Sequence, residues 1–175
     1  MIQTKLKAAI RDIQDFPKPG ILFKDITPIL KDAALCSDVL DAFAAELEGI
    51  EIDVIAGIES RGFLFGLMLA NKLGVPFVPI RKQGKLPFKK IQQPCELEYG
   101  SAILELHEDA ILPGQRVLIH DDLLATGGTV NAATRLVKQL QGSVAGYAFV
   151  ISLDFLNGKE ALKQESSNII SLVSF

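Results

Sequence analysis

One stretch in the second half of the chain combines an apolar strand, an acidic pair and a glycine turn. The apolar run 117–119 leads to Asp121 and Asp122, and a segment rich in hydroxyl groups and glycine follows at 125–129. Apolar residues then recur at helical spacing, which predicts that a helix begins directly after the turn. Open α/β sheets bind ligands where their strands end and such helices begin. The pattern therefore predicts a parallel α/β sheet with a binding site at this turn.

The turn has the groups that bind a phosphorylated sugar. A helix start offers unpaired backbone N–H groups and the positive end of the helix dipole to a phosphate. Gly127 and Gly128 allow a close approach, and Thr126 and Thr129 add hydroxyl donors. Because successive strand side chains point to opposite faces, we expect the strand to have begun turning at the acidic pair. The alternative is an ordinary strand–turn–helix junction with a solvated acidic pair.

Five segments, in the same order along the chain, resemble the type I phosphoribosyltransferases, and in particular the family members that use adenine. They are 16–28, 57–63, 81–87, 97–100 and the stretch 117–129, which includes Asp-Asp-Leu-Leu-Ala-Thr-Gly-Gly-Thr. The resemblance implies an α/β fold with a central parallel sheet flanked by helices, a small hood and a mobile lid loop. It implies a single domain over residues 1–175, with the hood contributed by about 15–30 and 82–106.

The same resemblance implies a reaction. The enzyme would transfer the phosphoribosyl group of phosphoribosyl diphosphate (PRPP) to adenine, giving AMP and diphosphate in purine salvage. The leaving diphosphate needs cations, and the cationic sugar must be shielded from water. The resemblance also implies Mg²⁺, bound mainly through PRPP, diphosphate and water, so no protein residue is assigned as a metal ligand. It implies a homodimer as well.

The resemblance assigns site residues one by one. The ribose and 5-phosphate of PRPP would bind Asp121, Asp122, Ala125, Thr126, Gly127, Gly128 and Thr129. The diphosphate would bind Glu59, Ser60, Arg61, Arg81, Lys82 and Lys85. Adenine would bind Leu22, Phe23, Lys24 and Leu123. The catalytic residues would be Glu98, as general acid and base, and Arg61, while Tyr99 would position the lid.

For two of these sets of residues, the loop 57–62 and the lysines of 82–94, the residue types themselves give a physical reason for the assignment. Backbone N–H groups in 57–62, with Arg61 as a bidentate donor, suit a diphosphate, and the family implies a cis peptide between Glu59 and Ser60. The alternative is that Ser60 caps a helix and Arg61 is solvated. Likewise, the lysines of the segment 82–94 would close over the diphosphate, and the alternative is a solvated surface loop.

The base needs a flat apolar slot and a few directed hydrogen bonds. Phe23 and Leu123 would form the slot, although Phe23, taken alone, is better explained as a simple core residue. The backbone carbonyl of Leu22 would accept from the amino group of adenine and repel the oxygen of a 6-oxopurine. Lys24 stands where many relatives have arginine, so the charge is kept but the bidentate fork is lost.

Composition excludes several classes of function. The net charge of −3 argues against a protein that coats nucleic acid. No apolar segment is long enough to span a bilayer, and residues 1–16 lack a signal-peptide core. Cys36 and Cys95 lie far apart without metal-ligand spacing and are interpreted as reduced thiols, with a single disulfide as the alternative. We therefore expect a cytoplasmic protein whose partners are small molecules, with no nucleic acid and no membrane.

Three alternative functions remain at this point. A sibling enzyme could use hypoxanthine, guanine or xanthine, but those enzymes usually recognise the oxygen with a lysine side chain. A PRPP-sensing regulator would lack Glu98 or the lysine loop and would usually have a DNA-binding segment. A PRPP synthetase would need paired domains, for which 175 residues are too few.

Periodicity and turn residues predict the order of the elements. A helical stripe at Leu6, Ile10 and Ile13 predicts a first helix that ends near Phe16 and Pro17, and further helices are expected at 32–48, 60–73 and 158–164. The helix at 60–73 is apolar on most sides and is therefore expected to be buried. Strands are expected at 53–58, 75–80, 97–99, 103–106, 116–120, 143–153 and 169–173, with a loop over 82–94.

Overall fold

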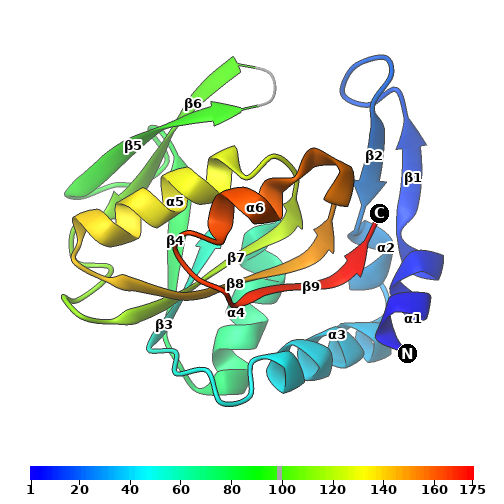
Figure 1. Ribbon diagram of the computed structural model, residues 1–175, viewed down its shortest axis with the longest axis horizontal. Helices are drawn as coiled ribbons and strands as arrows, with labels where there is room; N and C mark the ends of the chain where they lie inside the picture. The colour runs from blue at the N-terminus through cyan, green and yellow to red at the C-terminus, as the bar shows by residue number, and fades with distance from the viewer. Residues whose placement is uncertain (98–99) are drawn as a thin grey trace.

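The computed structural model describes residues 1–97 and 100–175 and has a seven-stranded sheet at its centre (Figure 1). In spatial order the sheet reads β5-β6-β4-β3-β7-β8-β9. The strands from β4 to β9 in this order are parallel, whereas β6 pairs antiparallel with both β4 and β5. Their bounds are β3 (Val54–Ile58), β4 (Phe77–Lys82), β5 (Lys90–Leu97), β6 (Gly100–His107), β7 (Arg116–Leu124), β8 (Ser143–Ser152) and β9 (Ile169–Ser174). The predicted central parallel sheet is confirmed.

Helices cover both faces of this sheet. One face packs against α5 (Gly128–Gln139) and α6 (Gly158–Leu162), and η1 (Asp154–Leu156) precedes α6. The other face packs against α3 (Ala33–Glu46) and α4 (Gly62–Leu73), with α1 (Ile2–Ala9) and α2 (Thr27–Leu30) at its edge. A second, two-stranded antiparallel sheet is formed by β1 (Arg11–Gln14) and β2 (Leu22–Asp25).

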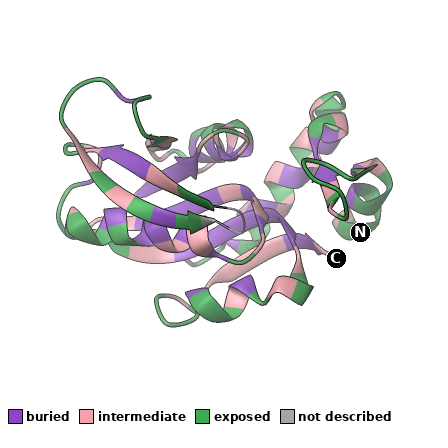
Figure 2. Ribbon diagram, turned by 90° about the horizontal axis from the view of Figure 1, so that it is seen from above, coloured by how far each residue is buried: buried purple, intermediate pink, exposed green. Residues whose placement is uncertain are grey.

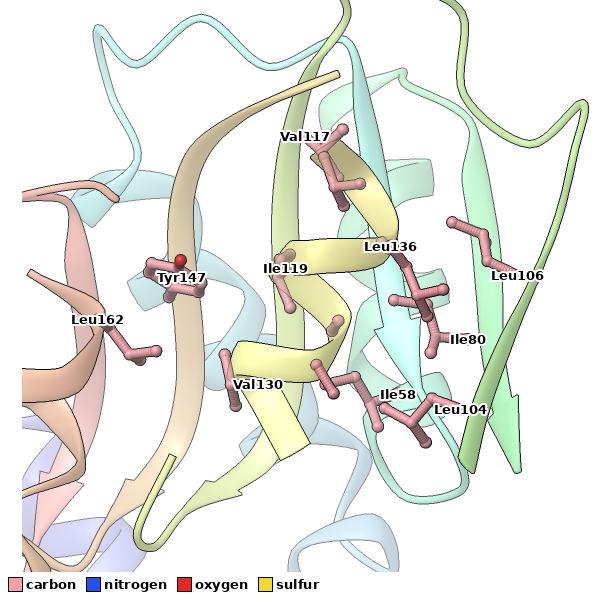
Figure 3. Packing of buried hydrophobic residues seen from close by; sticks show 14 of the residues in the cluster. Ile58, Ile80, Leu104, Leu106, Val117, Ile119, Val130, Leu136, Tyr147 and Leu162 are labelled. Atoms are coloured by element: carbon pink, nitrogen blue, oxygen red, sulfur yellow. The ribbon is translucent and has the colours of Figure 1, made fainter. Parts of the chain in front are cut away.

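The apolar run of β7 explains why the sheet is buried on both sides. Val117 and Ile119 pack into the cluster under α5, together with Leu136 (Figure 3). Leu118 points to the opposite face and packs with Phe43 and other residues of the α3–α4 layer. A strand covered on both faces reads as a continuous apolar run because neither set of side chains meets water. Figure 2 shows the buried residues concentrated in the central strands.

The structure corrects several predicted elements. The first helix ends at Ala9, and Ile13 lies in β1, where pairing with β2 satisfies the backbone. Ser60 does not cap α4, whose N-cap is Arg61 without a side-chain cap. The loop over 82–94 is shorter than predicted, because β5 begins at Lys90 and pairs along its length with β6.

Two further corrections concern helix α4 and strand β7. The helix is not buried on most sides, because Leu64 and Leu67 are 41% and 58% exposed. The motif strand does not turn at Asp121 but continues through Leu124, because β8 pairs with it up to the pair Leu124–Ser152.

Within the described residues, no helix has the length and apolar character needed to cross a membrane.

Candidate functional site

A cavity of about 710 Å³ lies at the carboxyl ends of β3 and β7 and brings together segments that are far apart in the sequence. It is bounded by β2, by the loop between β3 and α4, by the β5–β6 hairpin and by the turn after β7. Its lining residues are Phe16, Phe23, Glu59, Ser60, Arg61, Lys82, Cys95, Ala102, Leu104, Asp121, Asp122, Leu123, Ala125 and Thr129. The fold therefore places residues predicted for the sugar, the diphosphate and the base around one cavity.

One member of the acidic pair forms an ion pair with Arg61 in this cavity. The Nε atom of Arg61 lies 2.7 Å from Oδ2 of Asp122, and Oδ1 of Asp121 accepts the backbone N–H of Asp122 at 2.8 Å. Burial raises the pKa of Asp121 well above its usual value, and the adjacent Asp122 raises it further. Burial also raises the pKa of Asp122, although Arg61 opposes the shift. A buried carboxyl, Asp122, and a half-buried one, Asp121, thus lie side by side in the cavity, where sugar hydroxyls would supply hydrogen-bond donors to both.

The glycine turn after β7 is shaped by two residues. Gly127 has a φ of 88° at the N-cap of α5, a left-handed conformation that favours glycine, and no side chain caps the helix. A Cβ atom on Gly128 would lie 2.1 Å from the carbonyl oxygen of Glu96, so the β5 backbone approaches the helix start closely. The helix start thus presents backbone N–H groups without a capping side chain, which suits a phosphate.

The loop after β3 has the predicted cis peptide between Glu59 and Ser60. Although burial raises the pKa of Glu59, hydrogen bonds from the backbone of Lys82 (2.9 Å) and from Nε of Arg81 (3.2 Å) hold it below its ordinary value. Nη1 of Arg81 also donates to the carbonyl of Lys85 at 3.2 Å. Arg81 and Lys85 stand outside the residues that line the cavity, whereas Lys82 lines it.

The two faces of β2 lead to different places. Phe23 lines the main cavity, with Phe16 edge-on at 5.1 Å between centroids and the guanidinium of Arg61 4.8 Å from its ring centroid. Leu22 and Lys24, one residue to either side, line a separate cavity of about 360 Å³. Strand alternation accounts for the division. The side chains of Leu22 and Lys24 therefore point away from the cavity that contains Phe23.

The predicted residues Glu98 and Tyr99 lie outside the described residues. Sequence reasoning missed Phe16 and Cys95, which both line the main cavity. Phe16 is the first residue of a segment that resembles the family, so its place in the cavity could have been predicted from the sequence. Cys95 is buried on β5 with Sγ 3.8 Å from Oγ1 of Thr129, and burial raises the pKa of its thiol. Both cysteines, Cys95 and Cys36, are free.

The part of the cavity that the structure describes has few protein groups that could bind a magnesium ion. Within residues 1–97 and 100–175, no three histidine, cysteine, aspartate or glutamate side chains gather into a metal-binding group. Of the cavity's carboxylates, Glu59 and Asp122 already contact arginines, which leaves Asp121. Magnesium retains several waters and often binds through one or two carboxylates plus substrate phosphates. The residues present fit an ion that arrives on the substrate.

Comparisons with known proteins agree on one family. A family model described as the phosphoribosyl transferase domain matches residues 28–172. The adenine phosphoribosyltransferase of Thermoanaerobacter pseudethanolicus is 52% identical over 175 residues, which cover 100% of both chains. That of Cytophaga hutchinsonii is 47% identical over 175 residues, which cover 100% of this chain and 97% of the relative.

Solved structures give the same result. The crystal structure of the Thermoanaerobacter pseudethanolicus adenine phosphoribosyltransferase has a TM-score of 0.94 and 52% sequence identity, covering 99% of each chain. The Saccharomyces cerevisiae enzyme, complexed with an imino-altritol bisphosphate and adenine, has a TM-score of 0.90 and 43% identity, covering 98% of each chain. The type I phosphoribosyltransferase fold expected from the sequence is thereby confirmed.

Proposed function

The chain belongs to the phosphoribosyltransferase family, and on that premise we propose that it transfers the phosphoribosyl group of PRPP to adenine, giving AMP and diphosphate. The observation that carries this function is the match, over the full chain, to adenine phosphoribosyltransferases at about half identity. The cavity is consistent with it, because one space is lined by an acidic pair, a phosphate-type turn and an apolar slot.

The ribose and its 5-phosphate would bind at the end of β7. The carboxylates of Asp121 and Asp122 accept hydrogen bonds from the ribose hydroxyls, and Arg61 holds Asp122 in place. The 5-phosphate sits on the turn 125–129, where backbone N–H groups and threonine hydroxyls donate to it. The support for this assignment is the shape of the turn and the absence of a side-chain cap on α5.

The diphosphate would leave toward the loop after β3. Arg61 and Lys82 line the cavity and offer charge to the oxygens that become more negative as the bond breaks. Arg81 holds Glu59 and the carbonyl of Lys85, so it shapes the loop from outside the cavity. Magnesium, when bound with the diphosphate, would supply further positive charge for the leaving group.

Adenine would stack between Phe23 and Leu123. The edge contact with Phe16 and the contact with Arg61 fix the ring of Phe23 from two sides. The Leu22 backbone would read the amino group, and this role needs no side chain in the cavity. Glu98 would take the proton that the attacking base loses.

A purine-specificity assay tests the function. Purified protein would be given PRPP, magnesium and one base at a time: adenine, hypoxanthine, guanine or xanthine. We expect AMP from adenine and no nucleotide from the others, because the backbone carbonyl of Leu22 repels a 6-oxo group. Turnover of a 6-oxopurine would contradict the proposed role of Leu22 and Phe23 in binding the base. Binding of PRPP without turnover of any base would favour the alternative of a PRPP-sensing regulator.

We also propose a homodimer that uses helix α4. Leu64 and Leu67 stand exposed on this helix, directly after the loop with Arg61. Exposed leucines on one helix face are typical of a surface that another chain covers. A cytoplasmic location, and partners limited to small molecules, stay predictions from composition.

A further inference from the structure

The base-binding strand β2 belongs to a small sheet of its own. Strands β1 and β2 pair only with each other among the described residues, separately from the seven-stranded sheet that holds the acidic pair. Phe23 on this strand faces the main cavity. The geometry of the base slot therefore depends on contacts that fix β2 relative to the large sheet.

Phe175 provides such a contact from the large sheet. It follows β9, and its backbone is bonded to the end of β8 and the residues after it. Its N–H donates to the carbonyl of Ser152, the last residue of β8, and its carbonyl accepts from the N–H of Asp154, each at 3.0 Å. Figure 1 shows this end of β9 lying beside β2. The aromatic ring of Phe175 lines the cavity on the far face of β2.

Lys24 reaches this ring from the hairpin. Its Nζ atom lies 3.9 Å from the centroid of the Phe175 ring, and it also pairs with Asp12 of β1 at 2.7 Å. Lys24 is only 7% exposed, and an ammonium group without its water gains more from an aromatic face than an exposed one does. Lys7 approaches the same ring at 5.7 Å, so the ring faces two cations.

We propose that Phe175 is a positioning residue for adenine binding, which it acts on through Lys24. Lys24 and Phe23 are adjacent on β2 and point to opposite faces. Holding the Lys24 ammonium against the ring fixes the strand, and with it the plane of Phe23 and the backbone of Leu22. Phe175 itself touches neither substrate. The inference rests on the proposed function, since it concerns binding of the base.

The test compares steady-state kinetics with PRPP binding. Phe175→Leu keeps the apolar volume but removes the aromatic face. We expect its KM for adenine to rise about tenfold, with kcat changed less than twofold and the dissociation constant of PRPP unchanged. Phe175→Tyr retains the face and should restore the wild-type KM. The matched control is Phe155→Leu, which removes a 71% exposed aromatic ring of the same cavity and should leave the KM unchanged.

Lys24→Met tests the same contact from the hairpin, and it serves if Phe175→Leu does not fold. Lys24→Met should raise the KM for adenine. Because both substitutions remove the same contact, the KM of the double variant should be no higher than that of the single variant with the higher KM. Unchanged adenine KM in both single variants, equal effects of Phe175→Leu and Phe155→Leu, or a parallel loss of PRPP affinity would overturn the inference. Wild-type protein is assayed first: no turnover of adenine would refute the proposed function itself, whereas normal turnover with unaffected variants refutes only the role of Phe175.

Discussion

Asp121 and Asp122 are neighbours on β7 but meet different surroundings. Asp122 contacts Arg61, whereas Asp121 accepts only its neighbour's N–H among the hydrogen bonds of the described residues. A carboxyl whose pKa is raised by folding binds its proton more tightly in the folded than in the unfolded chain. Its contribution to stability therefore falls as the pH rises from about 3.8 toward the raised pKa. The residue that would bind ribose thus destabilises the empty protein at neutral pH.

Asp121→Asn should separate binding from stability. The amide is neutral, so we expect the variant to unfold at the same or a higher temperature at pH 8. Its dissociation constant for PRPP should rise roughly tenfold to a hundredfold, because a charged acceptor is lost. Calorimetric titration and thermal unfolding measure the two effects. Exposed Asp109→Asn, which removes the same charge elsewhere, is the control. Unchanged PRPP affinity would remove Asp121 from the ribose site.

Glu98→Gln should lower turnover far more than substrate affinity. A general base contributes about 100-fold or more in rate, while the amide preserves the size of the side chain. Steady-state kinetics and PRPP titration give the two quantities. Glu96→Gln, an exposed glutamate on β5, is the matched control and should behave as the wild type. Wild-type turnover in Glu98→Gln would exclude Glu98 from the mechanism.

At the scale of elements, local patterns predicted α3 and several buried strands well, but not α1 or α2. The helix predicted from Asp32 is α3, and the Asp32 side chain accepts from the N–H groups of Ala34 and Leu35 at its start. Strands β3, β8 and β9 lie within two residues of their predicted bounds. The strands have continuous apolar runs, and the helix has a clear capping residue. Such signals can be recognised within a few consecutive residues of the sequence.

The missed elements depend on partners outside such a window. Strand β5 begins with polar residues such as Lys90 and Gln92 and reads as a loop, yet its backbone hydrogen bonds come from β6. The candidate site shows the same division. Only some of the predicted residues line the main cavity, and Leu22, Lys24, Arg81 and Lys85 lie outside it. Cys95 lines it because β5 pairs with β6 in one register and packs on α5. The opposite orientation of Lys24 likewise followed from strand pairing that the sequence pattern did not indicate.

The contact between β5 and α5 makes Gly128 a sensitive position. A methyl group there would meet the Glu96 carbonyl at 2.1 Å, and a backbone oxygen cannot move alone. Gly128→Ala should therefore displace β5, increase hydrogen exchange in both strands of the β5–β6 hairpin and weaken PRPP binding at least tenfold. Asn131→Ala, on the next turn of α5, is the control. Unchanged exchange in Gly128→Ala would show that the hairpin does not depend on this contact.

At the scale of the whole molecule, helix α4 has exposed leucines that the core of this chain does not cover. Leu67, at 58% exposure, lies on α4, which directly follows the loop with Arg61. Leu67→Glu would place a charge in the proposed dimer interface, and we expect the variant to sediment as a monomer with reduced activity. Exposed Leu112→Glu, outside α4, is the control and should stay dimeric. A wild-type protein that sediments as a monomer would refute the dimer.

Stability of the whole molecule toward acid should be limited by His120. Its ring is buried in the α3–α4 layer, edge-on to Phe43 at 5.5 Å, and burial lowers its pKa from 6.5 to about 4. Both states are neutral above pH 6.5, so the stability is fully present there. As the pH falls toward 4, only the unfolded chain takes up the proton, and about 3 kcal/mol is lost.

His120→Leu should remove this loss. Between pH 6.5 and 4, the urea midpoint of the wild type should fall more steeply than that of the variant, while at pH 8 the two have no protonation difference. The variant should therefore gain stability relative to the wild type as acid is added, because only the wild type loses the contribution of His120. His107→Leu, which removes the other histidine, is the control for the loss of an imidazole ring. Parallel pH profiles for His120→Leu and the wild type would show that His120 is protonated equally in both states.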